Sequence, residues 1–266
     1  MSKLSDYKIA EQVYANASTL IQRAVRLCDQ QSVILRSINN PYPTTKQLSR
    51  FTYSYELLKR FAHLNIIQVL DWIETDKSPV MVLEDQHAID LRQYRLAQKK
   101  QQLSIEQFIF IGTQLADALY EIHHHRIIHK DLHPGNILIS PESGIVQVID
   151  FGLSSLLSRE QPALKPPEQI EGVLDYISPE QTGRMNRGLD YRSDFYSLGI
   201  IFYELLSGHV PFSGQDTLAK VHNHIAKQQK PLTGVRYNAP PALSQIINKL
   251  MAKSAEDRYQ SALGLK

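Results

Sequence analysis

One stretch of the chain, residues 127–152, restricts the possible fold more than any other part of the sequence. It reads IIHKDLHPGNILISPESGIVQVIDFG, in which short runs of β-branched and other apolar residues alternate with polar turns. Such runs favour strands, and the turns beside them carry Asp131, Asn136 and Asp150. Carboxylate and amide oxygens on neighbouring turns are typical of a site for phosphate and a divalent metal ion. We therefore expect the rest of the chain to be arranged around these oxygen ligands.

Length and charge limit the class of protein. The chain has 266 residues, which is enough for one large domain or for two lobes with a cleft between them. Its 29 basic and 27 acidic residues are nearly balanced, which argues against a protein that mainly coats nucleic acid. The N-terminus lacks the pattern of a signal segment, and no run of 18 apolar residues occurs. We therefore expect no nucleic-acid partner and no membrane association.

A single cysteine, Cys28, excludes an internal disulfide. This favours a reducing, cytoplasmic location. We interpret Cys28 as a small apolar residue in a strand, and the alternative is a reactive thiol.

The N-terminal third has the pattern of an antiparallel sheet with one inserted helix. Pro41 and Pro43 break the chain, and apolar residues at helical spacing then predict a helix over residues 47–62. Alternating or β-branched apolar runs predict strands over residues 7–13, 19–27, 32–38, 66–73 and 80–83.

From about residue 88 the pattern becomes helical. Ser104 and Gln107 form a capping-box pattern, and the apolar residues that follow predict a long buried helix leading into the stretch at residue 127. Ser193 is predicted to cap a second buried helix, which ends at Gly208. Two further amphipathic helices are predicted over residues 217–226 and 243–253.

The motifs in this order resemble a known family. HKDLHPGN, residues 129–136, resembles the catalytic loop of eukaryotic-type protein kinases, and DFG, residues 150–152, resembles their metal-binding triplet. Glu180 resembles the last residue of their activation segment, Asp194 an aspartate of their central helix, and Arg258 the partner of Glu180. Residues 171–187 resemble, more narrowly, the kinase module at the head of large bacterial, often cyanobacterial, signalling proteins.

The resemblance implies an α+β, bilobal protein-kinase-like fold. Residues 1–84 would form a small antiparallel β-rich lobe with one helix, and residues 85–266 a larger helical lobe; together they would make one kinase domain. The chain would be a fragment of a longer polypeptide, with its downstream domains as partners.

The implied activity is that of an ATP-dependent serine/threonine protein kinase acting in signal transduction. Asp131 would orient the hydroxyl of a protein substrate and accept its proton, while Asn136 and Asp150 would hold Mg²⁺. His133 stands where the loop usually carries a lysine that steadies the γ-phosphate. The residues implied at the nucleotide are Val13, Ile21, Ile34, Arg36, Glu84, Gln86 and Leu138.

The half of the site that would clamp the phosphates departs from the family pattern. The first glycine of the chain is Gly112, so residues 13–21 lack the glycines of a phosphate-covering loop. Arg36 replaces the usual lysine, and Ser54 falls where the partner glutamate belongs. Val173 replaces a threonine near the catalytic aspartate. These changes leave open an alternative, a pseudokinase that regulates attached domains by contact.

Two clusters of side chains have structural and functional interpretations. Imidazoles at and after a helix end suggest a metal site, but neighbouring residues there point in different directions, so we interpret them as structural. These are His123, His124, His125, His129 and His133. Arg184, Arg187 and Arg192 form a basic patch that is either a solvated surface or a docking surface for a partner domain or an acidic substrate.

Overall fold

The computed structural model describes residues 3–98, 101–157, 170–185, 187–236 and 239–266. Contacts within the chain divide it into two units, residues 1–88 and 89–266. The first unit thus extends past the expected end at residue 84. Asp85 belongs to it because its carboxylate accepts hydrogen bonds from Arg23, at 2.6 Å, and from Ser32, at 2.7 Å.

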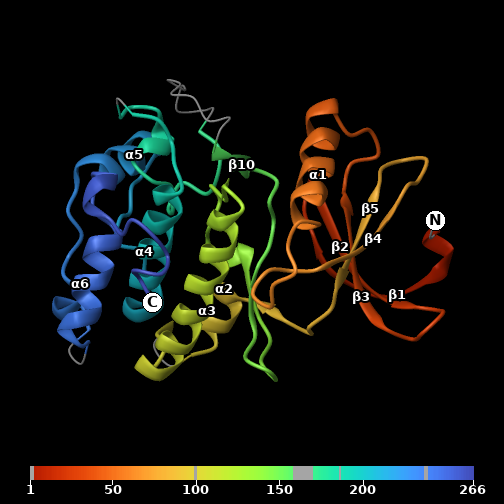
Figure 1. The fold of residues 1–266 in the computed structure, drawn as a ribbon, viewed down its shortest axis with the longest axis horizontal. Coiled ribbons are helices and arrows are strands. Elements are labelled where there is room, and N and C mark those ends of the chain that lie inside the picture. The colour runs from red at the N-terminus through yellow and green to blue at the C-terminus, as the bar shows by residue number, and fades with distance from the viewer. Residues whose placement is uncertain (1–2, 99–100, 158–169, 186, 237–238) are drawn as a thin grey trace. The chain divides into compact units, whose positions relative to one another are not determined.

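The first unit is a five-stranded antiparallel sheet with one helix (Figure 1). The strand order is β1-β2-β3-β5-β4. The elements are β1 (Tyr7–Ala15), β2 (Thr19–Arg26), β3 (Ser32–Ile38), α1 (Thr45–Leu58), β4 (Val69–Ile73) and β5 (Val80–Glu84). All five predicted strands are present, although β4 begins at Val69 instead of residue 66. The helix begins earlier than predicted because Thr44 and Gln47 cap it reciprocally.

Alternation along the strands decides which face of this sheet is buried. One face carries a tightly packed core formed by Tyr7, Ala24, Val33, Leu35, Ile73, Val80 and Val82. The opposite face meets α1, where the rings of Phe51 and Tyr55 lie 5.5 and 4.5 Å from the ring of Trp72. Arg36 lies on the α1 face, since it pairs with Met81, which pairs in turn with Trp72.

The second unit is mainly helical, with short strands near its candidate site (Figure 1). Its helices are α2 (Leu91–Leu96), α3 (Ile105–His124), α4 (Arg192–Ser207), α5 (Thr217–Ala226) and α6 (Pro241–Leu250). Its strands are β6 (Ile89–Asp90), β7 (Ile127–Ile128), β8 (Ile137–Ile139), β9 (Val146–Val148) and β10 (Ser155–Leu156). They form the antiparallel sheets β6-β8-β9 and β10-β7. Short 3-10 turns cover Leu4–Asp6, Pro134–Asn136, Glu180–Thr182, Leu232–Gly234 and Ala255–Asp257.

The caps of the two buried helices test the sequence predictions. Ser104 and Gln107 form the predicted capping box at the start of α3, with bonds of 3.1 and 2.9 Å. Gly208 ends α4 as predicted, with a φ of 87°. The prediction that Ser193 caps α4 is wrong: the helix begins at Arg192, and the buried Ser193 hydroxyl donates to Glu180 at 2.6 Å.

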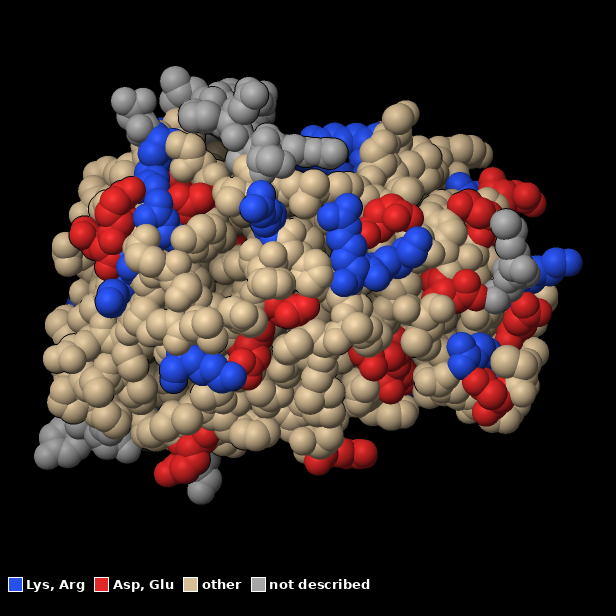
Figure 2. Space-filling model, in the orientation of Figure 1, with Lys and Arg blue, Asp and Glu red and all other residues tan. Residues whose placement is uncertain are grey.

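Cys28 was expected in a strand, and this prediction is also wrong. It is exposed and lies in the turn after β2. The strand ends at Arg26 because the Arg26 guanidinium pairs with Asp29 at 2.6 Å and its N–H donates to the Gln31 carbonyl, which closes the turn. Among the described helices, none is long and apolar enough to cross a bilayer. Figure 2 shows basic and acidic side chains interspersed on the face it draws.

Candidate active site

The loop that carries Asp131 is anchored on a buried carboxylate. Asp194, in the first turn of α4, accepts hydrogen bonds from the backbone N–H groups of His129 and Lys130, both at 2.9 Å. His123 Nε2 lies 2.9 Å from the same carboxylate. Burial by itself raises the pKa of Asp194, but the His123 bond, nearby imidazoles and the backbone donors hold that pKa below its ordinary value. The carboxylate therefore stays charged and fixes the loop.

Asp131 is held by a donor on each of its carboxylate oxygens. Asn136 Nδ2 donates to Asp131 Oδ2 at 3.2 Å and to the Asp131 carbonyl at 2.9 Å. The Val173 N–H donates to Oδ1 at 3.3 Å. The Asp131 side chain keeps 16% of its surface exposed. A carboxylate that is oriented in this way and still reachable can accept the proton of a hydroxyl group.

Gly172 allows the backbone to approach Asp131 this closely. Its φ is +98°, a conformation that favours glycine, and a Cβ atom there would lie 3.1 Å from Asp131 Oδ1. The Val173 N–H reaches the carboxylate from this turn, so the backbone supplies a contact although the Val173 side chain has no donor. Sequence reasoning assigned Gly172 no role, since its conformation follows from how this segment meets Asp131.

His133 faces Asp131 as a neutral imidazole. Its Nδ1 accepts the Gly135 N–H at 3.0 Å, so in the neutral ring the proton is on Nε2, which lies 3.9 Å from Asp131 Oδ2. Burial is the main cause that lowers the pKa of His133 below 6.5. Near pH 7 this residue therefore provides an N–H group beside Asp131 and no positive charge.

Asp150 and Asn136 lie on two turns that are bonded directly to each other. The Ile149 N–H donates to the Asn136 carbonyl at 3.0 Å. Asp150 has a φ of +63°, and its Oδ1 accepts the Gly152 N–H at 3.1 Å. The neighbouring Phe151 is fully buried, with its ring 4.9 Å from that of His129. The turn after β9 is thus locked to the loop after β7.

These two residues fit Mg²⁺ by the type of ligand they offer. The Asn136 amide nitrogen donates to Asp131, which directs its oxygen to accept or to bind a cation. Mg²⁺ is usually bound by one or two carboxylate or amide oxygens together with substrate phosphates and water. Within the described ranges, no cluster of three or more His, Cys, Asp or Glu residues could hold a metal ion. A magnesium ion at Asn136 and Asp150 would therefore depend on bound phosphate.

The histidines at and after the end of α3 have other partners. His123 is bonded to Asp194, and His125 Nδ1 donates to the Glu121 carbonyl at 3.0 Å. His129 Nε2 donates to the Ile149 carbonyl at 3.0 Å. These side chains hold the helix end and the loop together.

In the first unit, the turn between β1 and β2 is closed by its own hydrogen bonds. The Asn16 side chain accepts the N–H groups of Ser18 and Thr19 at 2.8 and 2.7 Å, and the Asn16 N–H donates to the Thr19 carbonyl at 2.9 Å. A glycine-rich loop covers phosphates with free backbone N–H groups. Here three of these groups are already bonded, so the turn offers few donors to a phosphate.

Arg36 and Ser54 do not form an ion pair. The Arg36 guanidinium carbon lies 5.9 Å from the centre of the Phe51 ring on α1. Ser54, three residues further along this helix, is 1% exposed, and among the described residues its hydroxyl has no hydrogen-bond partner. Glu56 lies on the exposed side of α1, 3.6 Å from Lys59. The position of the expected glutamate is therefore filled by a buried, neutral side chain.

Three further predicted nucleotide residues lie in the strands of the first unit. Ile21 lies opposite Arg36, and Ile34 precedes Arg36 by two residues, so all three share the α1 face of the sheet. Val13 is 47% exposed and sits where the register between β1 and β2 shifts. The sheet thus brings Ile21, Ile34 and Arg36 together.

The predicted adenine contacts fall at the end of β5 and in β8. The Glu84 N–H donates to the Gln68 carbonyl at 3.1 Å, so a base paired to this backbone would meet the Glu84 carbonyl instead. The Gln86 side chain donates to the Glu84 carboxylate at 3.0 Å. Leu138 is half-buried in β8 of the second unit, opposite Gln147.

The predicted partnership of Glu180 with Arg258 is confirmed. The two side chains form a bidentate, fully buried ion pair with N–O distances of 2.6 and 2.9 Å. Burial by itself raises the pKa of Glu180, but the bonds and charge of Arg258, together with Ser193, hold that pKa below 4.5. The pair ties the turn Glu180–Thr182 to Arg258, which follows the turn Ala255–Asp257.

Acidic neighbours neutralise most of the basic patch. Arg187 pairs with Glu256 at 2.6 Å, and Arg192 pairs with Asp190 at 2.8 Å. Arg184 donates to the Thr182 carbonyl at 3.1 Å. These contacts favour the interpretation of a surface held by ion pairs.

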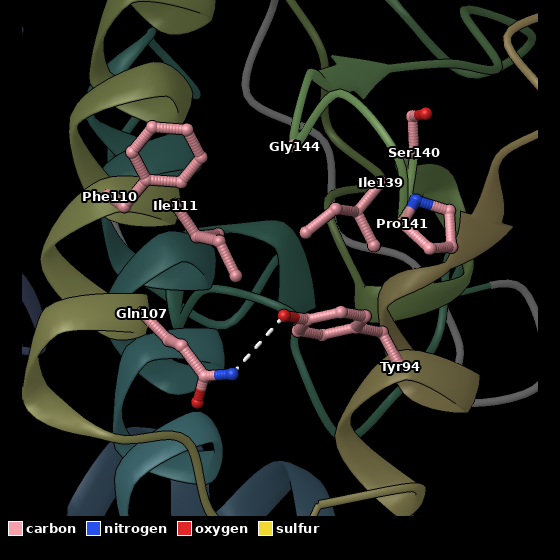
Figure 3. Close-up of a pocket in the computed structure, with 8 residues that line it drawn as sticks. All are labelled: Tyr94, Gln107, Phe110, Ile111, Ile139, Ser140, Pro141 and Gly144. Atoms are coloured by element: carbon pink, nitrogen blue, oxygen red, sulfur yellow. Dashed lines mark hydrogen bonds between the residues drawn. The ribbon is translucent and has the colours of Figure 1, made fainter.

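A small pocket lies elsewhere in the second unit (Figure 3). It is lined by Tyr94, Gln107, Phe110, Ile111, Ile139, Ser140, Pro141 and Gly144. Two of the lining side chains are joined by a hydrogen bond from Gln107 Nε2 to the Tyr94 hydroxyl at 3.3 Å. The lining carries no carboxylate and none of the predicted site residues, so this pocket is not suited to phosphoryl transfer.

Comparisons with known proteins agree with the geometry. The protein kinase domain family matches residues 7–264. A probable serine/threonine-protein kinase of Clostridium perfringens is 34% identical over 80% of this chain and 30% of its own length. A probable serine/threonine-protein kinase PknB of Lactococcus lactis is 32% identical over 80% of this chain and 33% of its own. The Myxococcus xanthus serine/threonine-protein kinase pkn3 is 28% identical over 98% of this chain and 48% of its own. The chain therefore spans less than half of the length of each of these relatives. Because the family matches residues 7–264, the chain belongs to the protein kinase domain family.

Proposed function

We propose that this domain transfers the γ-phosphate of ATP to serine or threonine hydroxyls of protein substrates, with Mg²⁺ as the metal. The observation that carries the proposal is the Asp131 carboxylate, which is oriented by Asn136 and by the Val173 N–H in a loop anchored on Asp194. Phosphoryl transfer requires alignment and charge stabilisation more than covalent chemistry from the protein, and a fixed carboxylate serves that need.

The residues of the second unit have separate roles in this proposal. Asp131 orients the substrate hydroxyl and accepts its proton. Asn136 and Asp150 would hold Mg²⁺, which neutralises charge on the phosphates when it is bound. The His133 N–H lies beside Asp131 and offers a neutral donor to the same region. Arg36, Ile21, Ile34, Val13, Glu84, Gln86 and Leu138 are the residues proposed to contact the nucleotide.

The names of the relatives support serine and threonine as acceptors, and their greater length supports further domains in the same polypeptide. We accordingly propose protein substrates, attached downstream domains as partners, and a cytoplasmic location. The bonded turn at Asn16 and the neutral Ser54 predict slow turnover, because both weaken the grip on the phosphates.

Label transfer from ATP tests this function. The purified chain is incubated with Mg²⁺ and γ-labelled ATP, alone and with a generic protein acceptor, and the labelled amino acid is then identified. Asp150→Asn should abolish transfer, whereas Asp76→Asn, which changes an exposed aspartate of the first unit in the same way, should not. Label on serine or threonine is expected. Absence of transfer by the unaltered chain, without any rise in melting temperature on adding Mg²⁺ and ATP, would support the pseudokinase alternative.

A further inference from the structure

Arg92 is an exposed cation beside the loop that carries Asp131. Asp90 caps α2 by accepting the Gln93 N–H at 2.8 Å, which places Arg92 in the first turn of this helix. The helix packs against the turn Pro134–Asn136. A Cβ atom on Gly135 would lie 4.0 Å from Arg92 Nη2. The guanidinium therefore lies beside a glycine of the loop that carries Asp131.

The ring of His133 packs against the same glycine. The Cβ position of Gly135 lies 2.9 Å from His133 Cε1, and His133 Nε2 lies 3.9 Å from Asp131 Oδ2. Guanidinium, glycine, imidazole and carboxylate thus follow one another along the surface of the second unit. Burial is the largest cause that lowers the pKa of His133, and the charges of His129 and then of Arg92 lower it further. The charge of Arg92 therefore acts on the imidazole that lies beside Asp131.

Two carboxylates that, like Arg92, act on the Tyr176 phenol are engaged with other cations. Glu204 is bound to the buried Arg95 at 3.0 Å, and Asp175 is bound to Lys220 at 2.6 Å. Among the described residues, no carboxylate forms an ion pair with Arg92. Of the two arginines of α2, one is thus neutralised inside the unit and the other presents its charge to solvent.

We propose that Arg92, which lies beside Gly135 and His133, forms a subsite for an anionic side chain of the substrate. The proposal rests on the kinase function proposed above and adds the class of substrate: a segment with an acidic or phosphorylated residue close to the phosphoacceptor. A guanidinium binds carboxylate and phosphate through paired N–H groups, and that of Arg92 is exposed beside the loop that carries Asp131.

Peptide kinetics test the subsite. One neutral peptide with a single serine is prepared with glutamate, phosphoserine or glutamine at each of the three positions on either side of the serine. At one position, glutamate or phosphoserine should raise kcat/KM over glutamine by about fivefold or more, mainly through KM. The relative size of the two effects distinguishes a site for carboxylate from one for phosphate.

Variants distinguish a loss of the subsite from a general loss of folding or activity. Arg92→Gln should remove the preference and leave the rate on the glutamine peptide unchanged, and Arg92→Glu should favour a lysine at that position. Lys230→Gln removes one exposed positive charge elsewhere in the same unit and should keep the preference. Equal rates for the glutamate, phosphoserine and glutamine peptides, or a preference that survives Arg92→Glu, would overturn the subsite.

A binding measurement keeps this inference distinct from the kinase function. The same peptides with alanine in place of the acceptor serine carry a fluorophore, and their binding is followed by polarisation. Anionic peptides should bind about fivefold more tightly than the glutamine peptide to the unaltered chain, and equally to Arg92→Gln. If no peptide is phosphorylated but this difference is present, the kinase function fails and the subsite stands. If phosphorylation occurs without the difference, the subsite fails and the kinase function stands.

Discussion

Replacing Gly172 by alanine should misplace Asp131 without unfolding the protein. The residue has a φ of +98°, and its new Cβ would lie 3.1 Å from Asp131 Oδ1 and 3.6 Å from the Lys130 carbonyl. Either the carboxylate moves by a few tenths of an ångström or the turn relaxes toward an ordinary φ. In both cases the Val173 N–H, now 3.3 Å from Oδ1, loses its alignment.

The size of the effect follows from the interaction that is lost. A hydrogen bond to a charged group contributes about 1.5–3 kcal/mol, so its loss in the transition state lowers kcat/KM by roughly 10- to 150-fold. Backbone strain at a positive φ costs about 1–3 kcal/mol, which corresponds to a fall in melting temperature of roughly 2–12 °C.

The assay compares kcat/KM and melting temperature for Gly172→Ala and Gly234→Ala. Gly234 is the matched control, since a Cβ there would meet nothing within 4 Å. Affinity for Mg²⁺ and ATP is measured in parallel and should stay unchanged in both variants.

Activity of Gly172→Ala within twofold of that of Gly234→Ala would refute the role assigned to this turn. A parallel loss of ATP affinity would also refute it, because the effect would then not be specific to Asp131.

Three further outcomes are expected. Arg36→Lys combined with Ser54→Glu should raise kcat/KM by roughly tenfold, about 1.4 kcal/mol, by rebuilding an ion pair between β3 and α1. An unchanged rate in a folded double variant would contradict the conclusion that the missing ion pair weakens the grip on the phosphates. Glu180→Gln should destabilise the fold by about 3–5 kcal/mol, since it leaves Arg258 buried without its partner, and denaturant unfolding measures this loss. Because the pKa of Glu180 is held below 4.5, the unfolded chain binds more protons at acid pH, so stability should fall below about pH 4.5. Glu180→Gln should flatten this fall, and an equally steep profile in the variant would show that other carboxylates cause it.

The parts of the fold that were predicted correctly depend on local sequence. The strand β3 has the predicted bounds, and α3 begins at the predicted capping box, because alternation and caps act within a few residues. The α+β kinase fold followed from several motifs in order, and the pairing of Glu180 with Arg258 followed from the same resemblance.

The parts that were missed depend on contacts distant in sequence. Ser193 has the residue type of a helix cap, yet its hydroxyl donates a hydrogen bond to Glu180, thirteen positions away. Gly172 looks like an ordinary loop glycine until the segment is placed against Asp131. Arg92 and Arg95 are the same residue type on the same short helix, and only the packing of α2 shows that Arg95 is paired with Glu204. Local patterns do not carry such information.

The central claim is that Asp131 acts as the proton acceptor of a phosphoryl transfer. The most direct test is the rate of transfer from saturating ATP and Mg²⁺ to a serine peptide by the unaltered chain and by Asp131→Asn. The account predicts a rate lower by about 10²- to 10⁴-fold in the variant, with unchanged ATP affinity and melting temperature. Equal rates in the two proteins would contradict it.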